Sequence, residues 1–259
     1  LFLVVTFTPS IRVIPAYAAE RAKQAAWLSP LITVLVFMAI VFLWHKLYEK
    51  YNNHTSMDIY SNITGRIAGK IIAVIHLLWL VILTALYIRY FAIRLVSSIY
   101  PNVSENIFIV SLLVVIAYTL RSGLIPLARF NEVIFAILTG TFFILVLLAL
   151  SNFKFEFLCP ITYRDILPIF KASGGSMGIL AYFSFFFIIG DRINNQESIK
   201  RIALPLSLFL LVFIIANIGI AIGTFGYSLV QRFPLPFLMS VKQISLFNTL
   251  EKIESLVIA

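Results

Sequence analysis

Long apolar runs separated by short polar stretches dominate this chain of 259 residues. A helix needs about 20 apolar residues to cross the hydrocarbon core of a bilayer. Because no water in that core can pair with exposed backbone groups, we expect every such run to be helical. The pattern predicts an all-α integral membrane protein with seven spans, and the run 250–259 resembles the start of an eighth. The predicted spans are 1–18 (interrupted), 27–44, 71–96, 103–120, 133–150, 176–190 and 202–230.

The connection between the second and third predicted spans carries two local predictions. Residues 45–70 are polar, and we expect a short interfacial helix there that begins at Thr55 or Ser56, because hydroxyl side chains cap helix starts. His76 lies in the third predicted span. A histidine can relay protons near neutral pH, but a hydrogen bond to a neighbouring helix is the favoured interpretation.

Composition supports the membrane class and excludes several functions. The chain is 61% hydrophobic and 12% charged, whereas soluble domains have about 25% charged residues. The 20 Lys and Arg residues fall between the apolar runs, where lipid headgroups account for them, so we expect membrane lipid and no nucleic acid as a partner. Cys159 is the single cysteine, and no metal spacing or catalytic motif is found. The sequence therefore predicts neither a cofactor nor an enzyme.

The two ends of the chain suggest a fragment. It begins with Leu1 and ends within an apolar run, so we expect residues 1–259 to be one transmembrane domain truncated at both ends. The tripeptide A-Y-A at 16–18 also fits a cleaved signal peptide, although Pro9, Arg12 and Pro15 interrupt the preceding apolar run.

Those interruptions need an explanation. A proline in a helix interior costs about 3 kcal/mol, and an arginine at bilayer depth costs at least about 2.5 kcal/mol. The segment "TFTPSIRVIP" (6–15) holds two prolines and one arginine. Something in the protein must compensate for these costs, and what compensates is a pointer to its function.

Four stretches, taken in order along the chain, identify a family. They are "KQAAWLSPLI" (23–32), "LTALYIRYFAIRL" (83–95), "AYTLRSGLIPLARFNEV" (117–133) and "RFPLPFLMSVKQISLFNTLEKIE" (232–254). Together they resemble the spore germinant-receptor B-subunit family (GerAB-type spore germination permeases), a branch of the amino acid–polyamine–organocation (APC) transporter superfamily.

The resemblance implies a LeuT/APC-like bundle of about ten spans, arranged as two inverted repeats. In such folds the first helix of each repeat is discontinuous and forms the substrate site. The breaks are then expected at 8–15 in span 1 and at 173–182 in span 6. The resemblance and these breaks together give the expected ligand-binding residues, which are Thr8, Pro9, Ser10, Arg12, Thr84, Tyr87, Gly175, Gly178 and Tyr182.

Several of these residues have a structural alternative. Arg12 can instead extend its stem along apolar surface and place its charge at the interface. For Thr84 and Tyr87, interhelical hydrogen bonding or packing is favoured over a cavity. The chain also departs from the family pattern, because Arg12 stands in a segment where the family has glycine and small polar residues, and Ala25 stands where the family often has aspartate.

The function implied by the resemblance is that of a germinant-receptor subunit. It would bind a small nutrient, expected to be an amino acid, and signal germination through partner subunits of A and C type. Its expected location is the spore inner membrane or the bacterial cell membrane. The alternatives are a secondary amino-acid transporter of the same superfamily and a membrane scaffold that binds no ligand.

Overall fold

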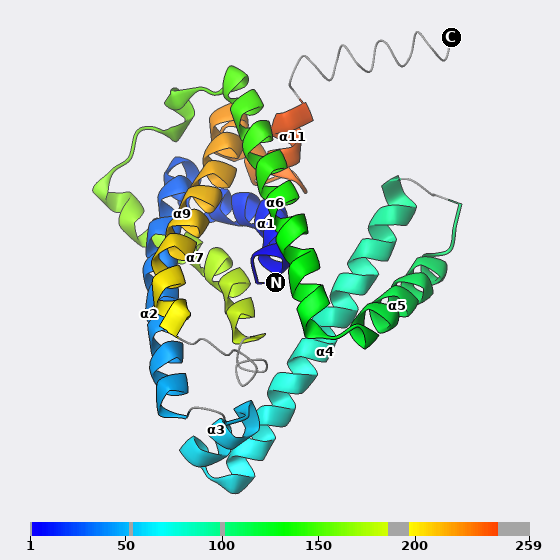
Figure 1. Ribbon diagram of the computed structural model, residues 1–259. Helices are drawn as coiled ribbons and strands as arrows, with labels where there is room; N and C mark the ends of the chain where they lie inside the picture. Colours follow the sequence, from blue (N-terminus) through cyan, green and yellow to red (C-terminus); the bar gives the residue numbers. More distant parts are fainter. Residues whose placement is uncertain (1, 52–53, 99–101, 186–196, 243–259) are drawn as a thin grey trace. The chain divides into compact units, whose positions relative to one another are not determined.

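The computed structural model describes residues 2–51, 54–98, 102–185 and 197–242, and Figure 1 shows that the regular elements in them are helices. In chain order these are α1 (Phe2–Ala22), η1 (Lys23–Leu28), α2 (Ser29–Lys50), α3 (Ser56–Thr64), α4 (Arg66–Ser98), α5 (Glu105–Arg121), α6 (Leu124–Ala149), η2 (Leu150–Asn152), η3 (Phe155–Leu158), η4 (Tyr163–Asp165), α7 (Ile166–Leu180), η5 (Ala181–Phe185), α9 (Glu197–Phe225), α10 (Tyr227–Val230) and α11 (Pro236–Lys242). The elements labelled η are 3₁₀ helices. The all-helical prediction is confirmed for the described residues.

Five stretches of the described residues are long and apolar enough to cross a membrane. They are Pro9–Leu47, Arg66–Ile93, Leu124–Asn152, Tyr163–Phe185 and Arg201–Phe225. The count differs from the predicted seven for two physical reasons. The predicted spans 1–18 and 27–44 join into one helical stretch through η1. The predicted span 103–120 forms α5, whose 17 residues extend about 26 Å, which is less than the hydrocarbon thickness of about 30 Å.

Two parts of the predicted span pattern cannot be compared with the structure. The start of an eighth span at 250–259 lies outside the described residues, and so do residues 186–190 of the predicted sixth span.

Helix α1 runs without interruption through 8–15, where the sequence predicts a break. Pro9 cannot donate a backbone hydrogen bond and disturbs the preceding turn. Pro9 therefore leaves the Val5 carbonyl without its helical donor, while the hydroxyl of Ser10 donates to the next carbonyl oxygen, that of Thr6, at 2.6 Å. The predicted discontinuity at 8–15 is therefore wrong. The chain leaves α-helical geometry at Lys23, whose φ is 50°, and η1 begins there.

Helix α7 likewise continues through most of the second predicted break, 173–182. It remains α-helical as far as Leu180, and the 3₁₀ helix η5 begins at Ala181. Gly175 in this segment serves close packing. A Cβ on Gly175 would lie only 2.5 Å from the ring of Tyr17, so glycine lets α1 and α7 approach each other. The prediction of a break within 173–180 is wrong.

The chain divides into two compact units. In the described part, unit 1 comprises residues 2–50, 134–185 and 197–242, and unit 2 comprises residues 51–133. Helix α6 begins in unit 2 and continues into unit 1.

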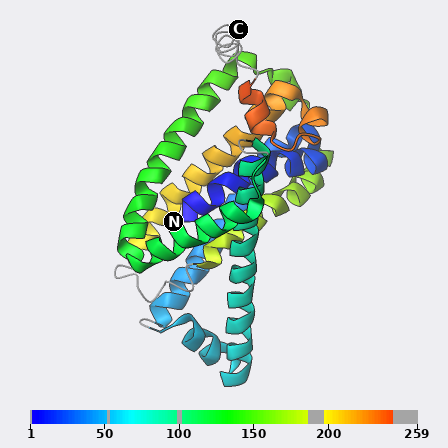
Figure 2. The same ribbon diagram turned by 90° about the vertical axis from the view of Figure 1, so that its right-hand side faces the viewer.

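Unit 1 is built around two helix pairs, α1 with α7 and α2 with α9 (Figures 1 and 2). The members of the first pair are antiparallel, because Tyr17 packs near Gly175 while Phe2 contacts Phe183 at the other end. Helices α2 and α9 also run in opposite directions (Figure 1). The first two helices of the chain therefore each pack against a later helix that runs the other way.

Aromatic rings fill the core of unit 1. Phe142 of α6 lies at the centre, with ring centroids 5.8 Å from Phe7, 4.5 Å from Phe213 and 5.0 Å from Phe237. These three partners belong to α1, α9 and α11. Aromatic pairs at such separations contribute about 0.5–1.5 kcal/mol beyond their area burial, so these rings fix α6 and α11 against α1 and α9.

A second group of rings, which we call the Phe183 cluster, closes the end of the α1–α7 pair that lies away from η1. It consists of Phe2, Phe37, Trp44 and Phe183. The rings of Phe2 and Phe37 stack at 5.6 Å. The ring of Phe183 meets Phe2, Phe37 and Trp44 edge-on, at centroid distances of 5.6, 5.4 and 5.7 Å. All four side chains are buried.

Unit 2 confirms the short helix predicted within 45–70 and the interhelical hydrogen bond predicted for His76. Helix α3 begins at Ser56 with Thr55 as its N-cap. The Thr55 hydroxyl accepts from the Asp58 backbone amide, and the Asp58 carboxylate accepts from the Thr55 amide at 3.1 Å. The Tyr60 hydroxyl lies 3.0 Å from Nδ1 of His76, so α3 is hydrogen-bonded to α4. Burial raises the pKa of Tyr60 above its usual 10.0, which keeps its hydroxyl protonated.

The contact of α3 with α4 depends on a glycine, and we expect Gly69→Ala to weaken it. A Cβ at position 69 would lie 2.5 Å from backbone atoms of Ser61, so the helices must separate at a cost of about 1–3 kcal/mol. Gly140→Ala is the matched control, because open space surrounds its Cβ position on α6 and alanine favours a helix by about 0.5–1 kcal/mol. Thermal unfolding in lipid nanodiscs measures both. A Gly69→Ala protein as stable as Gly140→Ala would contradict this packing.

The start of α3 is expected to loosen in acid. Hydrogen bonds from the Thr55 side chain and then its backbone amide hold the pKa of Asp58 below its usual 3.8. The ionised carboxylate therefore stabilises the helix above pH 3.8, and this contribution is lost as the pH falls through the lower folded pKa. Hydrogen-exchange protection of the Ile59 amide, which donates to the Thr55 carbonyl, is the measurement.

Asp58→Asn is the control for this titration, because it keeps the side-chain shape without the charge. We expect its Ile59 amide to show weaker protection without the acid transition. A wild-type protection profile without a transition below pH 3.8 would contradict the assignment.

Candidate functional site

The pairing of α1 with α7 brings together the two segments in which the sequence predicts a ligand site. Residues 8–15 lie on α1 and residues 173–180 lie on α7. Because the helices are antiparallel and in contact, the middle of one faces the middle of the other. We call this contact the α1–α7 seam. The structure thus provides the proximity that the prediction required, without the predicted helix breaks.

The predicted residues of α1 occupy different environments. Ser10 is buried, Pro9 is half-buried, and Arg12 is exposed. The backbone of Thr8 lies within α1, but its side chain falls outside the described part. The structure therefore places Ser10 in the interior, whereas Arg12 lies at the surface of unit 1.

The predicted ligand-binding residues of α7 and η5 also differ in how deeply they are buried. Gly175 is half-buried against Tyr17, whereas Gly178 is exposed and has open space where a Cβ would project. Tyr182 is half-buried in η5. Gly178 is thus the position on α7 where added bulk meets no neighbour, while Gly175 is already filled by an aromatic ring.

Thr84 and Tyr87 lie on α4 in unit 2. The Thr84 hydroxyl donates to the Leu80 carbonyl oxygen of its own helix at 2.8 Å. This bond is intrahelical, whereas the favoured structural interpretation of this residue was interhelical bonding or packing. A role for either residue in a site with α1 stays a prediction.

Sequence reasoning missed Asn217, a fully buried amide side chain of unit 1. It lies on α9 with an exposed fraction of 0%, and its Nδ2 donates to the carbonyl oxygen of Ser10 at 2.7 Å. Its Oδ1 is buried, and no hydrogen-bond donor for it is found in the described part of the chain. An uncompensated buried acceptor costs about 1–3 kcal/mol, so a ligand that supplies a donor would relieve this cost.

A signal for Asn217 does exist in the sequence. The residue stands alone in "FIIANIGIAIG" (213–223), and a polar side chain in the middle of an apolar span is a functional candidate. The predicted ligand site was instead assigned to the segments 8–15 and 173–182, because they contain prolines and glycines.

Hydroxyl groups extend the polar interior toward α2. The Thr33 hydroxyl donates to the carbonyl oxygens of Ser29 and Ser173, at 3.1 and 3.4 Å, and so joins α2 to α7. The hydroxyls of Ser29 and Ser176 are buried, and neither has a hydrogen-bond partner among the described residues. The interior therefore offers several neutral donors and acceptors.

Within the described residues, the buried polar side chains are hydroxyls, the Asn217 amide and the His45 imidazole. None of them is a carboxylate, an ammonium or a guanidinium, and the described part contains no group of three metal-ligating side chains. Such an interior can bind a small polar molecule through hydrogen bonds, but it lacks a fixed counter-charge.

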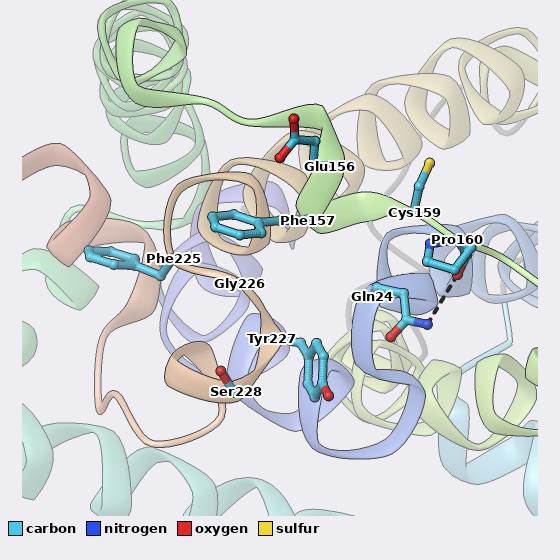
Figure 3. Close-up of a pocket in the computed structure, with 9 residues that line it drawn as sticks. All are labelled: Gln24, Glu156, Phe157, Cys159, Pro160, Phe225, Gly226, Tyr227 and Ser228. Atoms are coloured by element: carbon cyan, nitrogen blue, oxygen red, sulfur yellow. Dashed lines mark hydrogen bonds between the residues drawn. The ribbon is translucent and has the colours of Figure 1, made fainter.

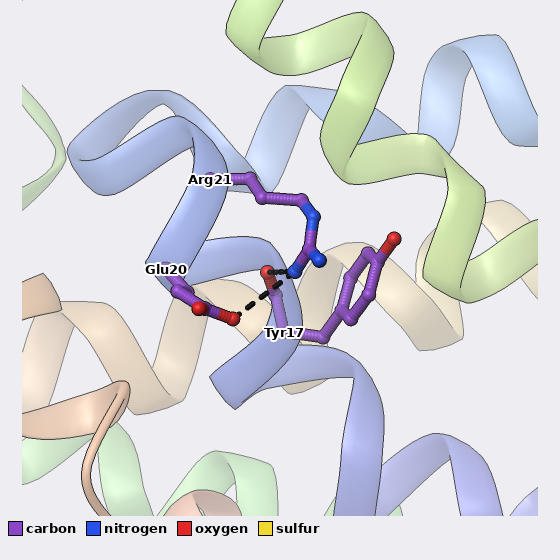
Figure 4. A network of polar contacts seen from close by, with 3 residues as sticks. All are labelled: Tyr17, Glu20 and Arg21. Carbon is purple, nitrogen blue, oxygen red and sulfur yellow. Dashed lines mark hydrogen bonds and ion pairs between the residues drawn. The ribbon is translucent and has the colours of Figure 1, made fainter.

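Charged side chains gather where α1 meets η1, as Figure 4 shows. The Arg21 guanidinium lies 3.6 Å from the centroid of the Tyr17 ring and donates to the Tyr17 carbonyl oxygen at 3.4 Å. It also pairs with the Glu20 carboxylate at 3.1 Å. The pair is exposed, and such pairs contribute about 0–1 kcal/mol. Its structural effect is to hold the Tyr17 ring that packs on Gly175.

Comparison with protein families matches residues 1–259 to the model of a family described as spore germination proteins. The chain belongs to this family. Membership and the apolar helices together make this spore germination protein an integral membrane protein of the spore or cell membrane.

Several curated relatives come from Bacillus subtilis (strain 168). Spore germination protein KB is 19% identical over 239 residues, covering 91% of this chain and 64% of that protein. YfkT is 23% identical over 265 residues, covering 98% and 70%. Spore germination protein YndE is 23% identical over 159 residues, covering 61% and 44%. The chain thus spans about two thirds of the length of the first two relatives. No solved structure matches it significantly.

We expect Asn217→Asp to destabilise this spore germination protein strongly. The aspartate would face the Ser10 carbonyl with an acceptor instead of a donor and would bury an uncompensated charge, at a cost of about 3 kcal/mol or more. Asn131→Asp is the matched control, because Nδ2 of Asn131 also donates to a helix carbonyl, that of Leu127 at 2.8 Å, but the side chain is half-buried. Unfolding temperatures in nanodiscs compare the two. Equal effects would show that the buried bond to Ser10 is unimportant.

Proposed function

We propose that this protein is the membrane subunit of a spore germinant receptor and binds a small nutrient, expected to be an amino acid, at the α1–α7 seam. The observation that carries the proposal is the antiparallel contact of α1 with α7. It sets the proline-containing segment of one helix beside the glycine-containing segment of the other. Paired Gly/Pro-interrupted apolar segments in corresponding positions are the best sequence pointer to a transporter-type site.

The helix pairing of unit 1 also supports an inverted-repeat arrangement of the LeuT/APC type. If α7 and α9 are the first two long helices of the second repeat, each packs against its counterpart of the first repeat, α7 on α1 and α9 on α2. Both pairs run in opposite directions, as inverted topology requires.

The chemistry of the seam suits a small zwitterion. Pro9 and Pro15 cannot donate to the carbonyls of Val5 and Ile11, and the Oδ1 of Asn217 is a further buried acceptor. These oxygens suit the ammonium group of an amino acid. The carboxylate of the ligand would be met by hydroxyl and backbone donors, with Arg12 as the nearest cation on α1 in the sequence.

Signalling requires two arrangements of the helices, and a ligand shifts their populations only as far as its affinity differs between them. The bond from Asn217 to Ser10 joins α9 to α1. A ligand that competes for the Asn217 amide would therefore change the position of α9 relative to α1. We propose that A- and C-type partner subunits detect this change. A secondary transporter would use the same fold for alternating access, because fold alone does not fix function.

The test is a thermal-shift screen of the common amino acids against the protein, expressed from its full reading frame in lipid nanodiscs. A ligand at about 100 times its dissociation constant stabilises by about 2.7 kcal/mol, which corresponds to a rise of about 5–10 °C in Tm. We expect one amino acid to give such a rise, and Arg12→Ala and Gly178→Leu to abolish it.

Matched controls make this test specific for the seam. Gly140→Leu adds the same bulk at a helical glycine of α6 that also has open space around it, and Arg164→Ala removes an exposed arginine near η4. Both should keep the ligand response. If Arg12→Ala and Gly178→Leu also keep it, the seam is not the site. If no amino acid stabilises folded wild-type protein, the amino-acid assignment is wrong. Uptake into vesicles then separates a carrier from a receptor.

A further inference from the structure

An open cleft of about 350 Å³ lies beside η1, outside the α1–α7 seam (Figure 3). Three segments that are distant in the sequence form it, namely η1, the stretch around η3, and the junction of α9 with α10. The residues that line it are Gln24, Glu156, Phe157, Cys159, Pro160, Phe225, Gly226, Tyr227 and Ser228. Its volume falls in the range of small-molecule sites, about 300–1,000 Å³.

Hydrogen bonds and backbone geometry hold these segments in place. The Gln24 side-chain amide donates to the Pro160 carbonyl oxygen at 3.0 Å and ties η1 to the stretch after η3. The Lys154 amide donates to the Gly223 carbonyl oxygen at 2.8 Å and ties the same stretch to α9. Gly226 has a φ of 73°, a conformation that glycine adopts readily, and it turns the chain from α9 into α10. The cleft is therefore built before any ligand arrives.

The lining chemistry is that of a site for a cation. Glu156 is the single charged residue of the lining, and its carboxylate makes no ion pair within the described part of the chain. The rings of Phe157, Phe225 and Tyr227 contribute the aromatic part of the lining. Aromatic faces attract ammonium groups by about 0.5–2 kcal/mol, and a carboxylate supplies a charge-assisted hydrogen bond.

The Lys154 ammonium lies 5.7 Å from the centroid of the Phe157 ring, so this ring already contacts a cation of the protein itself, and the remaining rings of the lining are those of Phe225 and Tyr227. No basic side chain is among the lining residues, whereas the carboxylate of Glu156 is. The lining thus favours a cationic amine over an anion.

We propose that this cleft binds a small organic ammonium, either a free amine or the ethanolamine headgroup of a lipid, with Glu156 as counter-ion. This site is separate from the α1–α7 seam, and its existence does not depend on the function proposed for that seam.

The test uses Cys159, the single cysteine of the sequence, which is exposed and lines the cleft. We measure its alkylation rate with neutral N-ethylmaleimide, at constant pH and ionic strength, for the protein in phosphatidylglycerol nanodiscs. At a probe concentration of about ten times the dissociation constant, n-butylammonium should slow the reaction about tenfold. The isosteric neutral butanol and the anion butanoate should leave the rate unchanged.

Two variants test whether the protection of Cys159 depends on the Glu156 carboxylate. Glu156→Gln keeps the shape and should abolish protection by butylammonium, whereas Glu105→Gln, on α5 of unit 2, should retain it. Each variant's rate is compared with its own rate without probe. Equal protection by butanol, or protection that survives in Glu156→Gln, would overturn the ammonium assignment.

A second arm distinguishes the two sources of the ammonium. Nanodiscs containing phosphatidylethanolamine should slow alkylation without added probe if the headgroup enters the cleft, and Glu156→Gln should remove this effect. Protection by butylammonium alone assigns a free amine. Protection by neither overturns the proposal. Because the readout is local to Cys159, these outcomes are independent of whether an amino acid binds at the seam.

Discussion

The need to pair every backbone polar group inside a hydrocarbon medium is the constraint on which unit 1 depends. Two prolines within α1 remove amide donors from a helix that must stay buried. The carbonyls that lose their helical donors are those of Val5 and Ile11, while the Ser10 hydroxyl adds a bond to the carbonyl of Thr6. Asn217 of α9 donates to the carbonyl of Ser10 within the same segment. The proline-containing segment of α1 is thus also the place where a side chain of α9 is bonded to its backbone.

The packing of α1, α7 and α2 also places their buried polar groups close together. Glycine on α7 admits the Tyr17 ring, so α1 and α7 pack closely, and the Thr33 hydroxyl of α2 donates to the Ser173 carbonyl of α7. Packing through small residues and hydrogen bonds is how helices associate where lipid offers no hydrophobic drive. The uncharged interior that results suits a ligand that brings its own balanced charges, which is why a zwitterion fits the proposed site.

Local features of this protein were predictable from sequence, and features that arise from tertiary contacts were not. The membrane class followed from the apolar runs, and the start of α3 directly after Thr55 followed from cap chemistry. A hydrogen bond from His76 to a neighbouring helix was predictable, although the identity of its partner, Tyr60, was not. The continuity of α1 through its two prolines was missed. The bond from Asn217 to Ser10 was also missed, because it joins residues that are 207 positions apart. The cleft beside η1 was likewise beyond a linear pattern, because its lining comes from three distant segments.

The Phe183 cluster has an electrical consequence. Its stacked and edge-on rings close one end of the α1–α7 pair with side chains that carry no formal charge. A constriction of apolar rings excludes water, and an ion without its hydration shell does not cross it. In this conformation the packed rings therefore oppose the passage of ions at this end of the α1–α7 pair.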